Sequence, residues 1–187
     1  MCDAAIDLLA SSGIRALPHR AVDRRAGAAE GTPSTYFRTR DALLRGVFAR
    51  VADRYLSDMN AWTEATQASP EGQTTMTLAQ LVMQSAEGPG SILNKARLEL
   101  TLYAVRHADL DTMVKDIGWQ FYTRAKAIIS ADPAASADPA IVETQTLVAL
   151  TFIEGVYIGF ARNIKIINTP EELNHHLQGI LRGTSHP

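Results

Sequence analysis

Apolar residues recur at three- and four-residue spacing along almost the whole chain, and this rhythm constrains the fold more than any other feature. The clearest stripe lies in residues 40–68 and consists of Leu43, Leu44, Val47, Phe48, Val51, Tyr55 and Met59. Such a stripe is typical of an amphipathic helix, and the alternation expected of a strand is absent from the sequence. The sequence therefore predicts an all-α protein.

Turn signals divide this helical sequence into separate elements. Gly13 and Gly27 predict the ends of two short helices, and Pro18 and Pro170 predict helix starts. A glycine-rich break is expected at residues 88–90. The expected helices cover about residues 3–9, 18–26, 30–37, 40–68, 77–86, 92–107, 110–131, 140–163 and 170–181. The helix at 140–163 is apolar almost all round, which predicts burial on more than one face.

Charge is distributed unevenly along a chain whose net charge is −2. Residues 1–52 contain eight arginines, no lysine and five acidic residues, a net charge of +3, and the remainder carries −5. The 187 residues suffice for one sizeable core, or for one core with a small appended module. A basic N-terminal part on an acidic body indicates that the N-terminal part meets an anion. Chance clustering of a small excess is the alternative.

Cysteine content and the lack of a visible targeting signal predict a cytoplasmic protein. Cys2 is the single cysteine, so an intrachain disulfide is excluded. The first residues lack the basic region of a signal peptide and include acidic side chains. The most apolar stretch, residues 147–161, contains Thr151 and Glu154 and is too short to span a bilayer. We therefore expect no membrane association.

Residues 31–44, GTPSTYFRTRDALL, place small polar residues beside an aromatic pair, directly before the long amphipathic helix. Three short helices followed by a long one form the layout of a helix-turn-helix, whose second helix approaches base edges in the major groove. Gly31 lets a backbone come close to DNA. Thr32, Ser34 and Thr35 supply short hydrogen-bond donors and acceptors for bases or phosphates.

The stretch AVDRRAGAAEGTPSTYFRTRDALL, residues 21–44, resembles the DNA-binding segment of the tetracycline-repressor-like (TetR/AcrR) transcriptional regulators. The resemblance covers about residues 3–51 and consists of matching residue types at fixed spacing from Gly27 onward. It implies an N-terminal three-helix helix-turn-helix DNA-binding domain in residues 1–45 and an all-helical ligand-binding and dimerisation domain in residues 46–187. It further implies a regulator that binds double-stranded DNA and is not an enzyme.

The resemblance also implies which positions contact DNA. A phosphate contact at the start of the second helix corresponds to His19 or Arg20. The base contacts correspond to Glu30, Gly31, Thr32 and Thr35, and the further phosphate contacts to Ser34, Tyr36 and Arg40. For Tyr36, packing in the core is an alternative of equal weight to a phosphate contact.

Three departures from the family pattern put DNA affinity in doubt more than the fold. Pro33 falls inside the recognition helix, where its ring is tolerated only in about the first turn. Ala28 and Ala29 weaken the cap of that helix. The basic arm that usually precedes the first helix is missing, which indicates a start farther upstream or a trimmed chain.

One recognition helix reads only a few base pairs, so useful specificity requires two copies spaced about 34–36 Å apart on a palindromic operator. The helices at 140–163 and 170–181 are the best candidates for a homodimer interface, and the resemblance implies the same four-helix contact. The expected interface residues are Ala149, Phe152, Val156, Gly159, Phe160, Leu177, Ile180 and Leu181. The alternative is that these helices bury one another within a single chain.

By resemblance, a small apolar or amphipathic effector enters a pocket between the body helices and releases a repressor from its operator. The candidate pocket residues mix apolar and polar groups, namely Trp62, Met83, Leu100, Tyr103, Trp119, Tyr122, Phe152, Glu154 and Tyr157. Glu99 and Glu154 are carboxylates within apolar runs, and a buried carboxylate needs a partner. We expect that partner to be Arg97, Arg106 or Arg162; a cationic ligand is the alternative.

Other classes of function find little support in the sequence. The histidines at 107, 175, 176 and 186 lack metal-ligand spacing, and no motif for a cofactor occurs. An all-helical enzyme or carrier would need a convergent acid, base or nucleophile, and none is visible. A further alternative is a regulator-like helical protein with weakened DNA binding that acts as a small-molecule-binding or protein-interaction module.

Overall fold

The computed structural model describes residues 1–17, 19–27, 37–67 and 74–184, without the side chains of residues 16, 19 and 62–67. This part of the chain contains helices and no strand, which confirms the all-α prediction. Contacts divide the chain into two compact units, Met1–Tyr55 with Glu87–Ile117 and Leu56–Ala86 with Gly118–Pro187. Helices α4 (Arg40–Gln67) and α7 (Ala108–Ser130) each run from the first unit into the second. The domain boundary after residue 45 stays a prediction.

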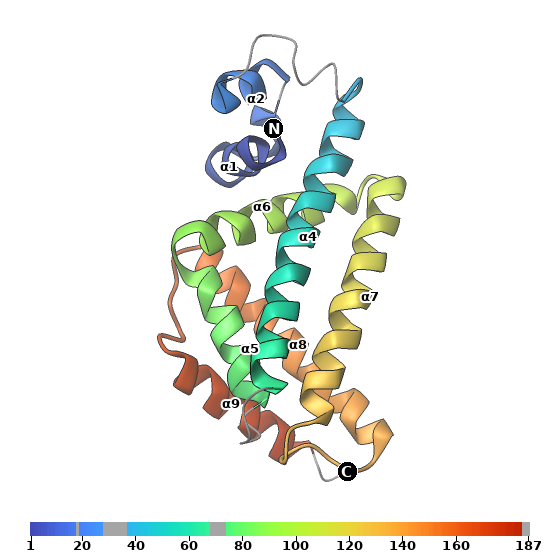
Figure 1. Cartoon of the computed structure of the whole chain (residues 1–187), viewed down its shortest axis with the longest axis vertical. Coiled ribbons are helices and arrows are strands. Elements are labelled where there is room, and N and C mark those ends of the chain that lie inside the picture. The colour runs from blue at the N-terminus through green and yellow to red at the C-terminus, as the bar shows by residue number, and fades with distance from the viewer. Residues whose placement is uncertain (18, 28–36, 68–73, 185–187) are drawn as a thin grey trace. The chain divides into compact units, whose positions relative to one another are not determined.

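The first unit packs the N-terminal helices on α6. It contains α1 (Cys2–Ser12), the 3₁₀ turn η1 (Ile14–Ala16), α2 (His19–Ala26), the first part of α4, α6 (Gly88–Ala104) and the start of α7. Helix α1 contacts both α2 and α6 (Figure 1). The whole apolar stripe predicted for α4 is buried, from Leu43 to Met59, as the helical spacing indicated.

Phe37 and Thr39 fix the start of α4. Thr39 Oγ1 accepts a hydrogen bond from Ala42 N (3.0 Å), so its side chain caps the helix. The ring of Phe37 lies against Gly46, where an added Cβ would come within 2.5 Å of the ring. Gly46 therefore provides the space in which Phe37 packs on α4.

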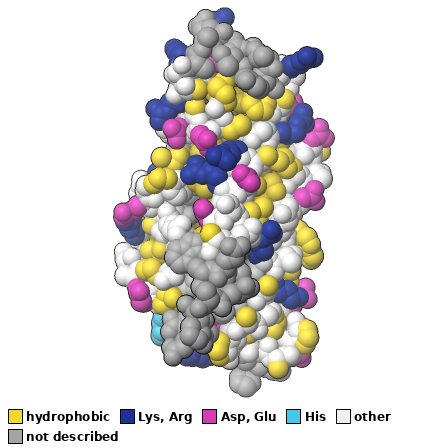
Figure 2. Space-filling view, in the orientation of Figure 1, with side chains coloured by type: hydrophobic (Ala, Val, Ile, Leu, Met, Phe, Trp, Pro, Cys, Tyr) yellow, Lys and Arg dark blue, Asp and Glu magenta, His cyan; other side chains and the backbone are white. Residues whose placement is uncertain are grey.

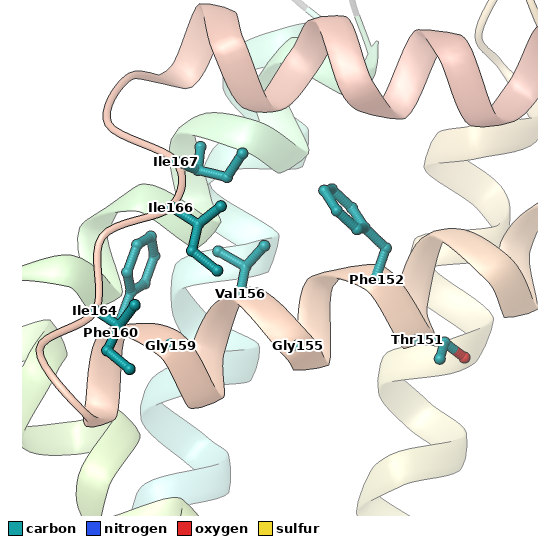
Figure 3. A pocket seen from close by; sticks show the side chains of 9 residues that line it. All are labelled: Thr151, Phe152, Gly155, Val156, Gly159, Phe160, Ile164, Ile166 and Ile167. Atoms are coloured by element: carbon teal, nitrogen blue, oxygen red, sulfur yellow. The ribbon is translucent and has the colours of Figure 1, made fainter.

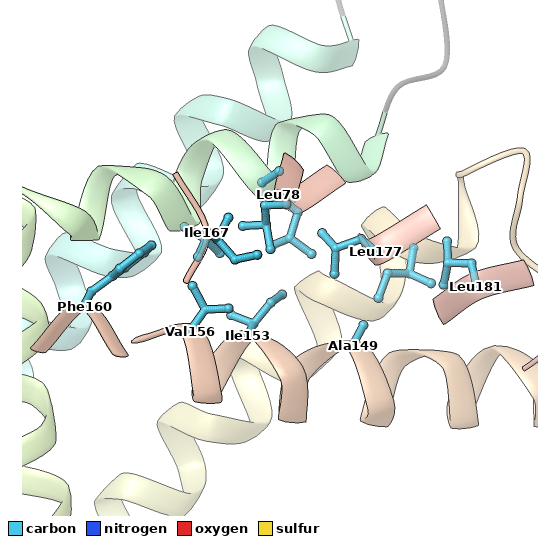
Figure 4. Close-up of a cluster of buried hydrophobic side chains, with 12 residues drawn as sticks. Leu78, Ala149, Ile153, Val156, Phe160, Ile167, Leu177 and Leu181 are labelled. Atoms are coloured by element: carbon cyan, nitrogen blue, oxygen red, sulfur yellow. The ribbon is translucent and has the colours of Figure 1, made fainter. Parts of the chain in front are cut away.

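The second unit is built around helices α8 (Pro139–Ala161) and α9 (Pro170–Gly183). Helix α5 (Thr74–Met83) packs along α9, and the 3₁₀ turn η2 (Gln84–Ala86) contacts α8. Figure 4 shows the resulting core, in which Leu78, Ile153, Val156, Leu177 and Leu181 meet between the helices. Asp138 caps α8 by accepting from Ala140 N (2.8 Å).

Helix α6 differs from its prediction at both ends. The GPG sequence at 88–90 was expected to break the chain, but α6 begins at Gly88 and Pro89 lies in its first turn, where a missing N–H costs nothing. The helix ends at Ala104 rather than near His107. Near this end Leu102 and Val105 are 68% and 72% exposed, so part of the apolar side of α6 is not covered by the chain.

Helix α8 is less buried than the sequence predicts. It has 23 residues, and its most apolar window of 18 residues has a mean hydropathy of 1.3, which by length and composition is enough to cross a membrane; only 28% of that window is buried. The prediction that no apolar segment approaches this length was therefore wrong. Burial on more than one face is likewise not found within the chain. One face of α8 forms the core, and the opposite face is exposed.

Asp132, in the turn after α7, ties three elements of the second unit together. It is 4% exposed, and its Oδ2 accepts hydrogen bonds from Thr74 Oγ1 (3.0 Å), Thr75 N (3.2 Å) and Thr75 Oγ1 (2.9 Å) at the start of α5. Gln178 Nε2 of α9 donates to the same carboxylate at 3.0 Å, and Ala134 N donates at 2.9 Å. Burial alone would raise the pKa of Asp132, but these hydrogen bonds together hold it below its usual value.

This depressed pKa predicts how stability depends on pH. The carboxylate contributes stability that is fully present above the ordinary Asp pKa of about 3.9 and is lost as the pH falls through the lower folded value. At about pH 7 the substitution Asp132→Asn should lower the free energy of unfolding by about 1.5–3 kcal/mol, because a charged acceptor becomes neutral. Urea unfolding should show a smaller difference from wild type near pH 3.

Asp58→Asn is the matched control, because Asp58 is exposed on α4. This variant should unfold like wild type at both pH values. A destabilisation by Asp132→Asn that stays constant down to about pH 3 would contradict the role assigned to the charged carboxylate.

Candidate nucleic-acid interface

Several arginines of the N-terminal part are occupied by contacts within the first unit. Arg25 Nη2 pairs with Asp7 Oδ2 at 3.0 Å, and Arg45 Nη1 lies 3.6 Å from Asp109 Oδ2. Arg50 Nε donates to Asp3 Oδ1 at 3.1 Å. This hydrogen bond holds the pKa of the Asp3 carboxyl below its usual value. Asp7, Asp109 and Asp3 are thus each paired with an arginine.

Four other arginines are exposed, and none of them forms an ion pair with a residue that the structure describes: Arg15, Arg20, Arg24 and Arg38. Arg20 and Arg24 are four residues apart on α2, so they share one helix face, while Val22 on the same helix is buried. Figure 2 shows Lys and Arg side chains in dark blue on the surface of the molecule. This part of the chain presents uncompensated positive charge.

Most of the predicted DNA contacts cannot be placed. Glu30, Gly31, Thr32, Ser34, Thr35 and Tyr36 lie outside the described residues, as do Ala28, Ala29 and Pro33. His19 is the first residue of α2, but its side chain is not described. Arg20 is exposed, as a phosphate contact requires. These residues stay predictions.

Arg40 and Glu99 both bind the backbone of Ile14. Arg40 Nη2 donates to Ile14 O at 2.8 Å, and its guanidinium carbon lies 5.6 Å from the centre of the Tyr103 ring. Ile14 N donates to Glu99 Oε2 at 3.2 Å. The partner of Glu99 is therefore a backbone N–H, and the arginine partner predicted for it was wrong. The sequence carried no signal for this contact because any residue type offers the same backbone groups.

The predicted ligand residues fall in both compact units. Leu100 and Tyr103 belong to the first, while Met83, Trp119, Tyr122, Phe152, Glu154 and Tyr157 belong to the second, and the side chain of Trp62 is not described. Leu100 is fully buried in its own unit, whereas Trp119 is 68% exposed and stacks on Tyr122 with ring centroids 5.2 Å apart. The hydroxyl of Tyr122 is buried and makes no hydrogen bond with a described residue. A shared pocket stays a prediction.

The predicted dimer residues divide into a buried and a partly exposed set. Five lie in the core of the second unit: Ala149, Val156, Phe160, Leu177 and Leu181. These five residues are therefore buried within one chain, as the alternative to a dimer interface had it. Gly159 also serves the chain itself, because an added Cβ would come within 3.0 Å of Ile164 O. Phe152 and Ile180 are partly exposed.

An apolar groove of about 290 Å³ lies on α8 and the segment that follows it. Phe152 and Val156 line it from the helix, and Ile164, Ile166 and Ile167 line it from the connection to α9 (Figure 3). The exposed face of α8 continues this surface with Val148, Thr151, Gly155 and Ile158, at three- and four-residue spacing. Sequence analysis missed the isoleucines, although three of them in a short connection are an unusual composition.

Metal binding finds no support in the described part of the chain, where no group of three His, Cys, Asp or Glu side chains could hold an ion. His176 lies beside Phe152, with ring centroids 5.8 Å apart. His107 stacks on Tyr103 at 3.8 Å. Both rings make packing contacts in these positions.

Solved structures of transcriptional regulators share this arrangement of helices. One from Rhodococcus sp. Rha1 has a TM-score of 0.73 at 19% identity and covers 96% of this chain and 91% of its own. A protein assigned to the TetR family, from Rhodococcus sp., has a TM-score of 0.72 at 19% identity over 98% and 96%. The multidrug binding protein EbrR, complexed with malachite green, has a TM-score of 0.65 at 19% identity over 98% and 94%.

The chain has the TetR-type fold. The likeness extends over nearly the full length of both chains, so it includes the N-terminal helices and the helical body. The sequence itself matches no protein-family model and no curated protein. At 19–20% identity the structural likeness concerns the fold.

Proposed function

We propose that this protein is a cytoplasmic, homodimeric transcriptional regulator that binds a palindromic operator and is released from it by a small apolar or amphipathic ligand. The observation that carries the proposal is the TetR-type fold over nearly the whole chain, combined with exposed arginines on α2 that form no ion pair with a described residue. The described residues give no reason to propose an enzyme.

DNA binding is supported by where the positive charge lies. The chain as a whole is slightly acidic, with a net charge of −2, so a general affinity for polyanions is not expected. Arg20 and Arg24 nevertheless stand on one exposed face of α2 without an ionic partner among the described residues. In a helix-turn-helix the helix preceding the recognition helix crosses the phosphate backbone. These two arginines are therefore the phosphate contacts that we propose for α2.

The salt dependence of DNA binding tests this assignment. Wild-type protein should retain specific duplexes selected from the DNA upstream of its own gene, with an affinity that falls steeply with salt. Arg24→Gln should reduce the magnitude of the slope of log K against log [salt] by about 0.9 per protomer, because one fewer counterion is released. Arg25→Gln is the matched control and should change the slope less, since Arg25 already pairs with Asp7.

Equal slopes for wild type and Arg24→Gln would remove Arg24 from the interface. If wild type shows no specific, salt-sensitive binding to any duplex, the DNA-binding proposal falls. The regulator-like helical protein that binds small molecules or protein partners would then be the better account.

Dimerisation is supported by the exposed apolar face of α8. The most apolar window of α8 has a mean hydropathy of 1.3 and is 28% buried, so apolar side chains such as Leu147, Val148 and Ile158 remain in contact with water. Surfaces of this kind mark association sites in proteins. Gly155 lies in the middle of this face with open space around it, so a second helix can approach closely. A second copy of α8 and α9 would cover both this face and the adjoining groove.

A charge placed on this face should separate the protomers. Ile158→Glu should shift the protein from dimer to monomer in sedimentation at micromolar concentration, because burying an unpaired carboxylate is costly. Helix content should stay as in wild type, since Ile158 is exposed within one chain. Leu102→Glu introduces the same charge at an exposed leucine of α6 and should leave the dimer intact. If Ile158→Glu, like Leu102→Glu, leaves the dimer intact, the assigned interface is contradicted.

Ligand binding is supported by the likeness to EbrR, which is described as a multidrug binding protein and was solved with malachite green. In this chain the buried hydroxyl of Tyr122 makes no hydrogen bond with a described residue, and a buried polar group of this kind favours a partner. We infer a population shift in which the ligand prefers a dimer whose DNA-binding parts are wrongly spaced for the operator.

Thermodynamic linkage provides the test of release. A screen by thermal unfolding against apolar and amphipathic cations, with malachite green as the first probe, should identify compounds that raise Tm. Such a compound should weaken operator binding, and operator DNA should weaken its binding by the same factor. Ligand binding without any effect on DNA affinity would contradict release.

A further inference from the structure

The turn between α1 and η1 leaves the backbone groups of Ile14 to bind side chains outside these two elements. Gly13 has φ 71° and ψ 177°, a conformation that is essentially restricted to glycine, and its N–H still closes α1 by donating to Leu9 O at 3.0 Å. The N–H of the next residue, Ile14, points away from α1 and donates to Glu99 Oε2 of α6 at 3.2 Å. A Cβ on residue 13 would lie 3.5 Å from the same oxygen, so the carboxylate fits closely against the glycine.

The carbonyl of the same residue is held from another side. Arg40, the first residue of α4, donates from Nη2 to Ile14 O at 2.8 Å. Its guanidinium carbon lies 5.6 Å from the ring centre of Tyr103, within the range of a cation–π contact. Tyr103 and Glu99 are four residues apart, so they share one face of α6. Two elements thus bind both polar groups of Ile14.

The ring that Arg40 approaches is itself held in place. Tyr103 stacks on His107 with ring centroids 3.8 Å apart and an interplanar angle of 13°. His107 Nδ1 lies 2.8 Å from Tyr103 O, which ties the imidazole back to the end of α6. Leaving this position for a DNA phosphate would cost Arg40 both a hydrogen bond and its aromatic contact.

We propose that Arg40 is a positioning residue and not a phosphate contact: together with Glu99 it clamps the backbone N–H and C=O of Ile14 and so fixes α1 and η1 against α6 and the start of α4. The part of this inference that concerns DNA rests on the proposed function. The part that concerns the clamp does not, because it predicts properties of the free protein.

Hydrogen exchange of the free protein tests the clamp. In Glu99→Ala the amide of Ile14 should exchange at least about tenfold faster, because its acceptor is lost. Glu99→Gln keeps a neutral acceptor and should restore part of the protection. The amide of Leu43, which donates to Thr39 O, is the internal reference and should not change. Unchanged exchange of Ile14 in Glu99→Ala overturns the clamp.

The salt dependence of DNA binding separates the two roles of Arg40. For a positioning residue, Arg40→Gln weakens operator binding by about tenfold at fixed salt and leaves the slope of log K against log [salt] as in wild type. Glu99→Ala should weaken binding similarly, and the double variant should lose less than the sum, because both side chains act on the backbone of one residue. A reduction of the slope magnitude by about 0.9 in Arg40→Gln overturns the proposal, whatever the exchange data show.

Failure of the proposed function gives a different result. If wild-type protein binds no duplex, DNA recognition is contradicted and the exchange of the Ile14 amide alone decides the clamp. If wild type binds DNA but neither Arg40→Gln nor Glu99→Ala changes its affinity, the positioning role is contradicted while DNA recognition stands.

Discussion

The exposed apolar face of α8 is the constraint on which the rest of this structure depends. One face of the helix builds the core of the second unit with Ile153 and Phe160, and the other carries Val148 and Ile158 into solvent. Burial of apolar surface drives both folding and association, at roughly 25 cal/mol per Å². We propose that a second copy covers the exposed side of α8, while the other side packs within its own chain.

The proposed dimer bears on DNA affinity as well. One set of exposed arginines, among them Arg20 and Arg24, supplies little affinity alone, but two sets on a dimer of the kind we propose would act together on the same duplex. Such cooperation requires that each set be held in a fixed place. The contacts of Arg40 and Glu99 with Ile14 provide this within the first unit.

Much of the fold could be predicted from the sequence because its signals are local. The apolar stripe of α4, the helix end at Gly13 and the helix start at Pro170 each depend on residues within one helix, and the structure confirms them. The incomplete burial of α8 could not be predicted, because an apolar side that faces the core and an apolar side that is exposed have the same composition.

The contacts of the candidate site were harder to predict for a similar reason. Arg40 binds a carbonyl 26 residues away and Glu99 binds an N–H 85 residues away, and backbone groups leave no trace in the sequence. Sequence analysis therefore could not anticipate either contact: it assigned Arg40 to phosphate by resemblance and gave Glu99 an arginine partner because of its charge. The sequence also could not predict that Arg24 forms no ion pair with a described residue, since its neighbour Arg25 has the same side chain and pairs with Asp7.

The stoichiometry of the DNA complex tests the central claim most directly. Native mass spectrometry of the full chain on a selected palindromic duplex should show two chains per duplex, with the two half-sites about one helical turn apart. Lengthening the spacer by half a turn should abolish this complex, because a rigid dimer cannot follow the rotated half-site. A complex with one chain per duplex, or one that tolerates the altered spacing, would contradict the account.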